Sequence, residues 1–220
     1  MSTRPLLVIG NKNYSSWSLR PWLLLRHFGV AFDEMRLPLD TPKFVSDIER
    51  WSPSRRVPAL RHGELTIWDS LAICEYVDET FLDRAGWPAD AAARAIARSV
   101  SAEMHAGFAA LRSALPMNCR KRVAHFVPSA DAQRDIARVC ALWRDCRARF
   151  GNAGAWLFNG FSIADAMYAP VALRFVTYGI TLDEVSRAYV DSVLGDSAIE
   201  QWLRDAAAEI EALPATDRIA

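Results

Sequence analysis

The sequence has no net charge, because its 26 lysines and arginines balance 26 aspartates and glutamates. A protein that binds nucleic acid or an anionic membrane through electrostatics carries a basic excess. The basic run Cys119-Arg120-Lys121-Arg122 is short, and we interpret it as a solvated surface patch. We therefore expect neither nucleic acid nor a membrane as a partner.

The sequence also lacks a long hydrophobic run and a metal-binding pattern of cysteines. The apolar run before Asn11 is too short for a signal peptide, and no stretch approaches the length of a transmembrane span. The cysteines form no C-x-x-C pair, and no histidine spacing predicts zinc. The expectation is a reduced, cytoplasmic protein that uses no metal and whose thiols are structural.

Strand and helix patterns alternate over residues 1–82. Leu6–Ile9 is apolar without alternation, which is typical of a strand buried on both faces. His62-Gly63-Glu64 is a hairpin signal between two short strand patterns. The order predicts an α/β domain, with strands at 6–9, 31–39, 58–61 and 65–68 and helices at 22–28, 42–50 and 71–81.

After a linker at 83–91, rich in Gly, Pro and charges, the strand patterns stop. The rest predicts an all-α domain over residues 92–220. Its long first helix is expected to begin at Ala91, the last residue of the linker. Ser162 and Asp165 have the spacing of a capping box, and Phe161 can serve as its hydrophobic staple. The expected helices are 91–115, 131–150, 162–178, 183–193 and 196–213.

Four motifs in this order carry a family resemblance: "YSSWSLR" after the first strand, "VPAL" before the third, "WDSLAICEYV" at the third helix and "SIADAMYAP" in the second domain. The chain resembles the cytosolic glutathione S-transferases over nearly its whole length, and its serine motif is most similar to the zeta class and its bacterial relatives. The resemblance implies a thioredoxin-like first domain, an all-helical second domain, glutathione as co-substrate and a homodimer.

The serine motif has two interpretations. Serine is a preferred helix N-cap, so a cap role alone accounts for Ser15 or Ser16. A proline destabilises a helix least in its first turn. Pro21 therefore predicts that the helix begins near Trp17 or Ser18 and that both serines precede it. A hydroxyl over a helix N-terminus favours a thiolate. By resemblance, Ser15 is the thiolate donor and Ser16 its assistant. Zeta enzymes usually carry a cysteine where this chain has Trp17, which argues against disulfide exchange and weakens an isomerase assignment.

The other glutathione contacts are also implied by the resemblance. Pro58 is expected to be cis, so that the Val57 backbone pairs with the cysteinyl part of glutathione. Ser70, at a helix start, is expected to hold the γ-glutamyl carboxylate, and Asp69 the ammonium group. Both are also ordinary cap residues. Either Arg55 or Arg56 is a candidate for the glycyl carboxylate.

A second-substrate pocket is expected between the domains. Met104 and Phe108 are four residues apart on the expected long helix and share a face, continued by Leu111. Core packing is the favoured alternative for such a stripe. The candidates for this pocket are Trp17, Met104, His105, Phe108 and Tyr168. Zeta isomerases carry an arginine for an acidic substrate, but Arg174 lies about one turn from that place, so its role is not transferred.

Three functions compete at this point. The first is addition of glutathione to electrophiles, and the second is glutathione-dependent cis–trans isomerisation of the zeta type. The third is a non-catalytic binding module with the same fold. The presence of Ser15, Pro58, Asp69 and Ser70 together favours a working glutathione site over the third function.

Overall fold

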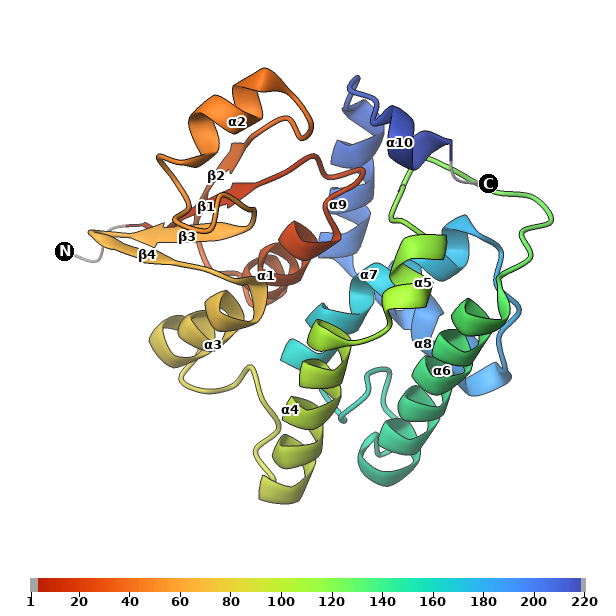
Figure 1. The fold of residues 1–220 in the computed structure, drawn as a ribbon. Coiled ribbons are helices and arrows are strands. Elements are labelled where there is room, and N and C mark those ends of the chain that lie inside the picture. The colour runs from red at the N-terminus through yellow and green to blue at the C-terminus, as the bar shows by residue number, and fades with distance from the viewer. Residues whose placement is uncertain (1–3, 219–220) are drawn as a thin grey trace.

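The computed structural model describes residues 4–218, so the ends of the expected domains at 1–3 and 219–220 lie outside the described residues. Figure 1 shows a small sheet with its helices at the left and a group of helices at the right. The elements of the first part are β1 (Leu6–Ile9), α1 (Ser16–His27), β2 (Asp33–Arg36), α2 (Pro42–Ile48), β3 (Ala59–His62), β4 (Leu65–Ile67) and α3 (Ser70–Phe81).

The sheet has the strand order β2-β1-β3-β4. β1 pairs in parallel with β2 and antiparallel with β3, and β3 pairs antiparallel with β4. Leu7 and Ile9 of β1 join the large core with α1 and α3, whereas Val8 joins a smaller core with Ile48 of α2. β1 is thus buried on both faces, as its unalternating sequence predicts. This is the expected thioredoxin-like arrangement.

Within the described residues, the named elements of the second part are all helices, as expected. They are α4 (Ala91–Ala106), α5 (Ala109–Ala114), α6 (Ala130–Phe150), α7 (Ile163–Thr177), α8 (Glu184–Leu194), α9 (Ser197–Ala208) and α10 (Pro214–Asp217). Within residues 4–218, no helix combines the length and the apolar character that crossing a membrane requires. We propose to place the domain boundary between α3 and α4, at the expected linker.

The prediction of one long helix over residues 91–115 is wrong. The helix ends at Gly107, and Phe108 takes the left-handed conformation with φ 57° before α5 begins. Nothing in the apolar periodicity signals this break, because the pattern continues through it. The break turns α5 so that Leu111 packs into the core.

The capping box at the start of α7 is confirmed. The Ser162 backbone N–H and hydroxyl both donate to Asp165 Oδ2, each at 2.9 Å. Asp165 Oδ1 also accepts from the Leu157 N–H at 3.1 Å, so this carboxylate ties the preceding loop to the helix. Burial raises the pKa of Asp165 to about 6.

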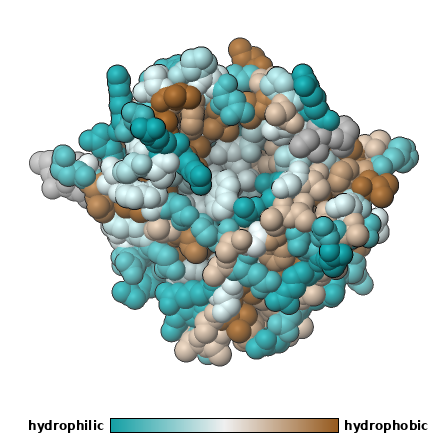
Figure 2. Space-filling model, in the orientation of Figure 1, coloured by the Kyte–Doolittle hydropathy of each residue, from teal (hydrophilic) through white to brown (hydrophobic). Residues whose placement is uncertain are grey.

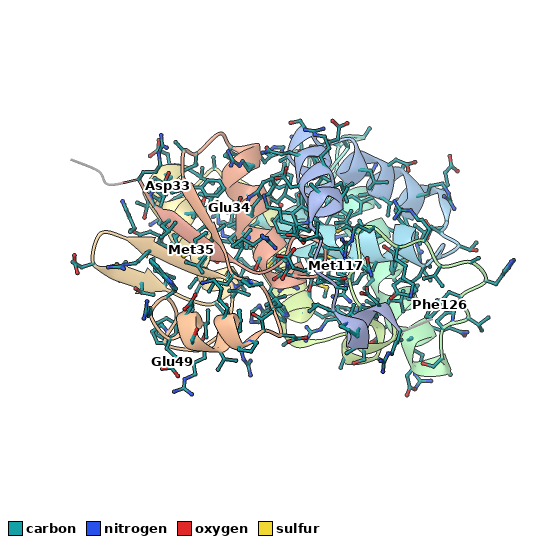
Figure 3. The ribbon with its side chains drawn as sticks, turned by 90° about the horizontal axis from the view of Figure 1, so that it is seen from above. Asp33, Glu34, Met35, Glu49, Met117 and Phe126 are labelled. Atoms are coloured by element: carbon teal, nitrogen blue, oxygen red, sulfur yellow. The ribbon has the colours of Figure 1, made fainter. Side chains whose placement is uncertain are left out.

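α1 lies between the two parts and contacts α3 on one side and α7 and α9 on the other (Figure 1). Seen from above, Met117 lies at the boundary between the sheet half and the helical half, where it is buried (Figure 3). Figure 3 also labels Glu34 on β2; its carboxylate accepts from Trp22 Nε1 at 2.6 Å and pairs with Lys12 at 2.9 Å. β2 thus contacts both the middle of α1 and the loop that leads into this helix.

Candidate active site

α1 begins earlier than expected. Ser15 is the N-cap and Ser16 the first helical residue, so Pro21 lies inside the helix and not in its first turn. An interior proline removes one backbone hydrogen bond. α1 tolerates this because its residues 18–25 are all buried, and tertiary packing outweighs the local cost. The helix begins one residue before the predicted Trp17, so the placement of Ser16 before the helix is wrong, and the pattern at 22–28 covers only its second half.

The hydroxyls of Ser15 and Ser16 face different partners. Ser15 is 6% exposed, makes no side-chain cap bond, and donates to Ser18 Oγ at 2.7 Å. Ser18 Oγ also accepts from the Gly10 N–H at 3.1 Å. Ser16 is half-buried, and its Oγ accepts from Arg174 Nη2 at 3.1 Å. The cap role expected as the alternative is therefore not what the Ser15 side chain performs.

The loop before β3 and the start of α3 lie near this end of α1. The Val57–Pro58 peptide bond is cis, as expected, and so is the Trp68–Asp69 bond. Asp69 is the N-cap of α3 and accepts from the Leu71 N–H at 3.2 Å. Asp69, and not Ser70, thus caps the helix.

Ser70 is fully buried as the first residue of α3. Its Oγ accepts from Arg20 Nη1 at 3.4 Å, a long contact. Arg20 comes from the middle of α1 and is 2% exposed, and its Nε has no hydrogen-bond partner. A buried guanidinium and a hydroxyl at a helix N-terminus form a place where a carboxylate is stabilised.

A pocket of about 410 Å³ joins these elements. The face shown in Figure 2 is hollowed near its centre, between the sheet domain at the left and the helices at the right, and mostly pale or teal residues surround the hollow. Ser15 and Ser16 are not in the pocket lining, but the next residue is. The lining consists of Trp17, Ser54, Arg56, Val57, Pro58, Trp68, Asp69, Ser70 and Arg112.

A larger cavity of about 730 Å³ lies between the linker and the residues before α7. None of the predicted site residues lines it, so the smaller pocket is the candidate site. Arg56 lines that smaller pocket, whereas Arg55 pairs with Glu49 at 2.8 Å on the surface. Of the two arginines left open by the sequence, Arg56 is the one at the site.

Three of the expected second-substrate residues belong to the core. Met104, Phe108 and Tyr168 are 2%, 7% and 0% exposed. Tyr168 donates to the Val100 carbonyl at 3.1 Å, and Phe108 is no longer on the same helix as Met104. The core alternative was therefore the right one for these residues. Trp17 and His105 remain near the pocket, their rings 5.2 Å apart.

The sequence interpretation missed two arginines of this region, Arg20 and Arg112. The Trp17 ring lies 4.2 Å from the Arg20 guanidinium and 5.0 Å from that of Arg112. Burial, and then Arg112, lowers the pKa of Arg20 to about 9 and the pKa of Arg174 to about 10. Both remain charged at neutral pH.

One carboxylate faces these cations within the pocket. Asp69 Oδ2 lies 2.8 Å from His105 Nε2, so an ammonium group that used Asp69 would share it with the imidazole. In the described part of the chain, no group of three or more His, Cys, Asp or Glu side chains is arranged to hold a metal ion. The site is cationic overall and suits an anionic ligand.

Comparison with known proteins agrees with this geometry. Residues 14–80 match the model of the glutathione S-transferase N-terminal domain. The maleylacetoacetate isomerases of Mus musculus and Rattus norvegicus are each 31% identical over 111 residues, which is 50% of this chain and 51% of theirs. The chain thus spans about half the length of the curated relatives it matches.

Solved structures show the same fold over nearly the whole chain. A glutathione transferase homolog from Burkholderia with bound glutathione has a TM-score of 0.72 at 23% identity, covering 94% of this chain and 100% of that one. A glutathione S-transferase from the Antarctic clam Laternula elliptica has a TM-score of 0.71 at 16% identity, covering 99% of both chains. Residues 14–80 therefore match the glutathione S-transferase N-terminal domain, and the chain as a whole has the fold of solved glutathione transferases.

Proposed function

We propose that this chain is a glutathione transferase, which binds glutathione in the 410 Å³ pocket and activates its thiol for attack on a small electrophile. One observation carries the proposal. The N-terminus of α1, the Val57–Pro58 loop and the buried N-terminus of α3 meet at one pocket, and guanidinium groups surround it. The backbone and the charged ends of a bound tripeptide thereby each have a partner of the right chemistry.

The contacts follow from the groups that line the pocket. The Val57 backbone pairs with the cysteinyl residue, next to Pro58. Ser70, with Arg20 behind it, receives the γ-glutamyl carboxylate, and Asp69 accepts from the ammonium group. Arg56 attracts the glycyl carboxylate, which remains in solvent reach because Arg56 is exposed.

The chemistry that the protein supplies is ionisation of the thiol. A free thiol has a pKa near ~8.5 and is mostly neutral at pH 7. A hydroxyl of the Ser15–Ser16 pair donates to the sulfur, and the positive end of α1 favours the anion. The thiolate then attacks the electrophilic carbon of the second substrate. Trp17 and Arg112 border the space for that substrate, and the His105 ring packs against Trp17.

A second candidate function is glutathione-dependent cis–trans isomerisation. The curated relatives are named as maleylacetoacetate isomerases, and the cationic surroundings of Trp17 suit an acidic substrate. Against it, Trp17 replaces the cysteine that zeta enzymes usually carry. Homodimer formation and a cytoplasmic location belong to the same proposal.

Calorimetric titration with glutathione, followed by a conjugation assay with an activated chloronitroarene, tests the proposal. We expect saturable binding and glutathione-dependent release of chloride. Isomerisation of a maleyl keto acid without conjugation would favour the second candidate. A chain that does not bind glutathione would overturn both.

A further inference from the structure

Arg174 is a buried cation that forms no ion pair with any carboxylate of the described residues. It lies on α7, is 6% exposed, and its Nη1 donates to the carbonyls of Arg112 (3.1 Å) and Leu115. Its Nη2 donates to Ser16 Oγ at 3.1 Å. Among residues 4–218, none of the ion pairs includes Arg174.

An unpaired buried charge is expensive, and neutral acceptors offset only part of the cost. The nearby Arg112 adds repulsion, since both groups are cations. The positive end of α1 is at the same place, because Ser16 is the first residue of that helix. Arg174 and the N-terminus of α1 thus create a positive potential on one side of the Ser16 oxygen. This potential stabilises an anion that binds on the other side.

The hydrogen bond from Arg174 also orients the Ser16 hydroxyl. A hydroxyl has one proton and two acceptor sites. With one acceptor site of Ser16 taken by Nη2, the proton is directed away from Arg174. The proton of Ser15, by contrast, points to Ser18 at 2.7 Å. Ser16 is also the more exposed of the two serines.

We infer that Arg174 is a positioning residue, which orients Ser16 as the hydrogen-bond donor to the thiolate of bound glutathione and supplies the buried positive charge behind it. The inference rests on the proposed function, and it makes Ser16, rather than Ser15, the main donor. No proton leaves Ser16 in this scheme. The glutathione thiol loses its proton to solvent, and the Ser16 hydroxyl donates to the sulfur that remains.

A direct role for Arg174 in holding the carboxylate of a second substrate fits less well. Both terminal nitrogens already donate to protein oxygens, and the side chain is almost fully buried. A substrate would have to displace the Ser16 hydroxyl to reach Nη2. Two backbone carbonyls hold the guanidinium in place behind α1.

The test titrates the ultraviolet absorbance of the thiolate in the glutathione complex against pH. Arg174→Met and Ser16→Ala are each expected to raise the pKa of the bound thiol by about one unit, a tenfold loss of thiolate at low pH. The double variant should raise it no further than the larger single effect, because the two residues act as one unit. Arg174→Lys should restore part of the shift, and Ser15→Ala should cause little.

Arg144→Met is the matched control, since Arg144 is an exposed arginine of α6 that pairs with Asp183. It should leave the titration unchanged. If Arg174→Met does not fold, Ser16→Ala and Arg174→Lys still decide the question. A titration that moves in Ser15→Ala but not in Ser16→Ala overturns the inference. So does an Arg174→Met variant that loses turnover only with anionic electrophiles. Wild-type protein that binds no glutathione would instead remove the proposed function.

Discussion

The neighbouring side chains of Asp69 and Ser70 perform separate tasks. Asp69 caps α3 through the Leu71 N–H, whereas the buried Ser70 hydroxyl faces Arg20. Serine at a helix start usually caps the helix, so its loss usually costs stability. Here the cap is supplied by the preceding residue, which leaves the Ser70 hydroxyl available to a ligand.

Ser70→Ala should therefore weaken glutathione binding by about 1.5–3 kcal/mol, the usual range for a hydrogen bond to a charged group. The melting temperature should change little, because Asp69 keeps the cap. Calorimetry measures the affinity, and thermal unfolding of the same sample serves as the control. Unchanged affinity with a large fall in melting temperature would show that Ser70 is structural only.

Asp165 gives a pH-dependent stability. Burial raises its pKa in the folded protein to about 6 from 3.8, so the folded state binds more protons than the unfolded state between these values. The free energy of unfolding from this group is largest below pH ~4 and falls as the pH rises to about 6. Above that pH both states are ionised and the contribution is constant.

Asp165→Ala leaves the buried N–H groups of Leu157 and Ser162 without their acceptor, at about 1–3 kcal/mol each. We expect a loss of about 2–6 kcal/mol near pH 4 and a smaller loss at pH 7. Denaturant unfolding at pH 4 and at pH 7 measures this loss of stability. Asp90→Ala, which removes a single cap bond to Ala93, should cost about 1 kcal/mol. A loss that grows with pH would contradict the assignment.

The break between α4 and α5 determines which residues reach the pocket. Arg112 Nη1 donates to the His105 carbonyl at 3.2 Å across the break. Gly107 permits it, since a Cβ there would lie 2.7 Å from the Glu103 carbonyl oxygen. The close approach requires glycine even though the Gly107 φ of −106° is open to other residues.

Gly107→Ala should lower the free energy of unfolding by about 1–3 kcal/mol, the usual cost of overpacking. Gly160→Ala is the control, because no atom lies within 4 Å of a Cβ built there. Its effect should stay within about 0.5 kcal/mol. Equal stability of the two variants in denaturant titrations would argue against a steric requirement for glycine at position 107.

Local motifs could be predicted because their signals lie within a few residues. The strands, the Ser162–Asp165 capping box and the cis peptide bond at Pro58 follow from short patterns or from the resemblance. The start of α1 could not, because burial of the whole helix outweighs the local rule for Pro21. The break at Gly107 was missed because apolar periodicity runs through it.

Apart from Arg56, the cations of the site could not be predicted either. Arg20, Arg112 and Arg174 come from α1, α5 and α7, so only the packing of two domains brings them together. No spacing along the chain encodes that meeting. The opposite error concerns Met104, Phe108 and Tyr168. They were predicted to line a pocket between the domains, but they are buried in the core.

At the scale of the whole molecule, α9 and the residue after it contact the loop before α1. Glu209, just after α9, accepts the backbone N–H groups of Lys12 and Asn13 at 2.7 and 3.1 Å. The buried Lys12 side chain pairs with Glu34 of β2 and Asp205 of α9. The loop that leads into Ser15 is therefore fixed by the second domain.

Assembly into a homodimer, which we propose from the family, should use the first domain of one subunit against the long helices of the other. Leu65 on the edge strand β4 of the first domain is a large apolar side chain that is 49% exposed. Leu65→Arg should therefore dissociate the dimer in sedimentation experiments at micromolar concentration. Val127→Arg, at an 82% exposed position in the second domain, should remain a dimer. A monomeric wild type would remove this claim.

The central claim is that the start of α1 ionises the thiol of bound glutathione, and one titration tests it most directly. Thiolate absorbance of the wild-type complex is followed against pH beside free glutathione at the same concentration. We predict that the pKa of the bound thiol lies at least about one unit below the ordinary value near ~8.5, which means at least a tenfold gain in thiolate at low pH. Saturable binding with a thiol that titrates at the free value would contradict the claim.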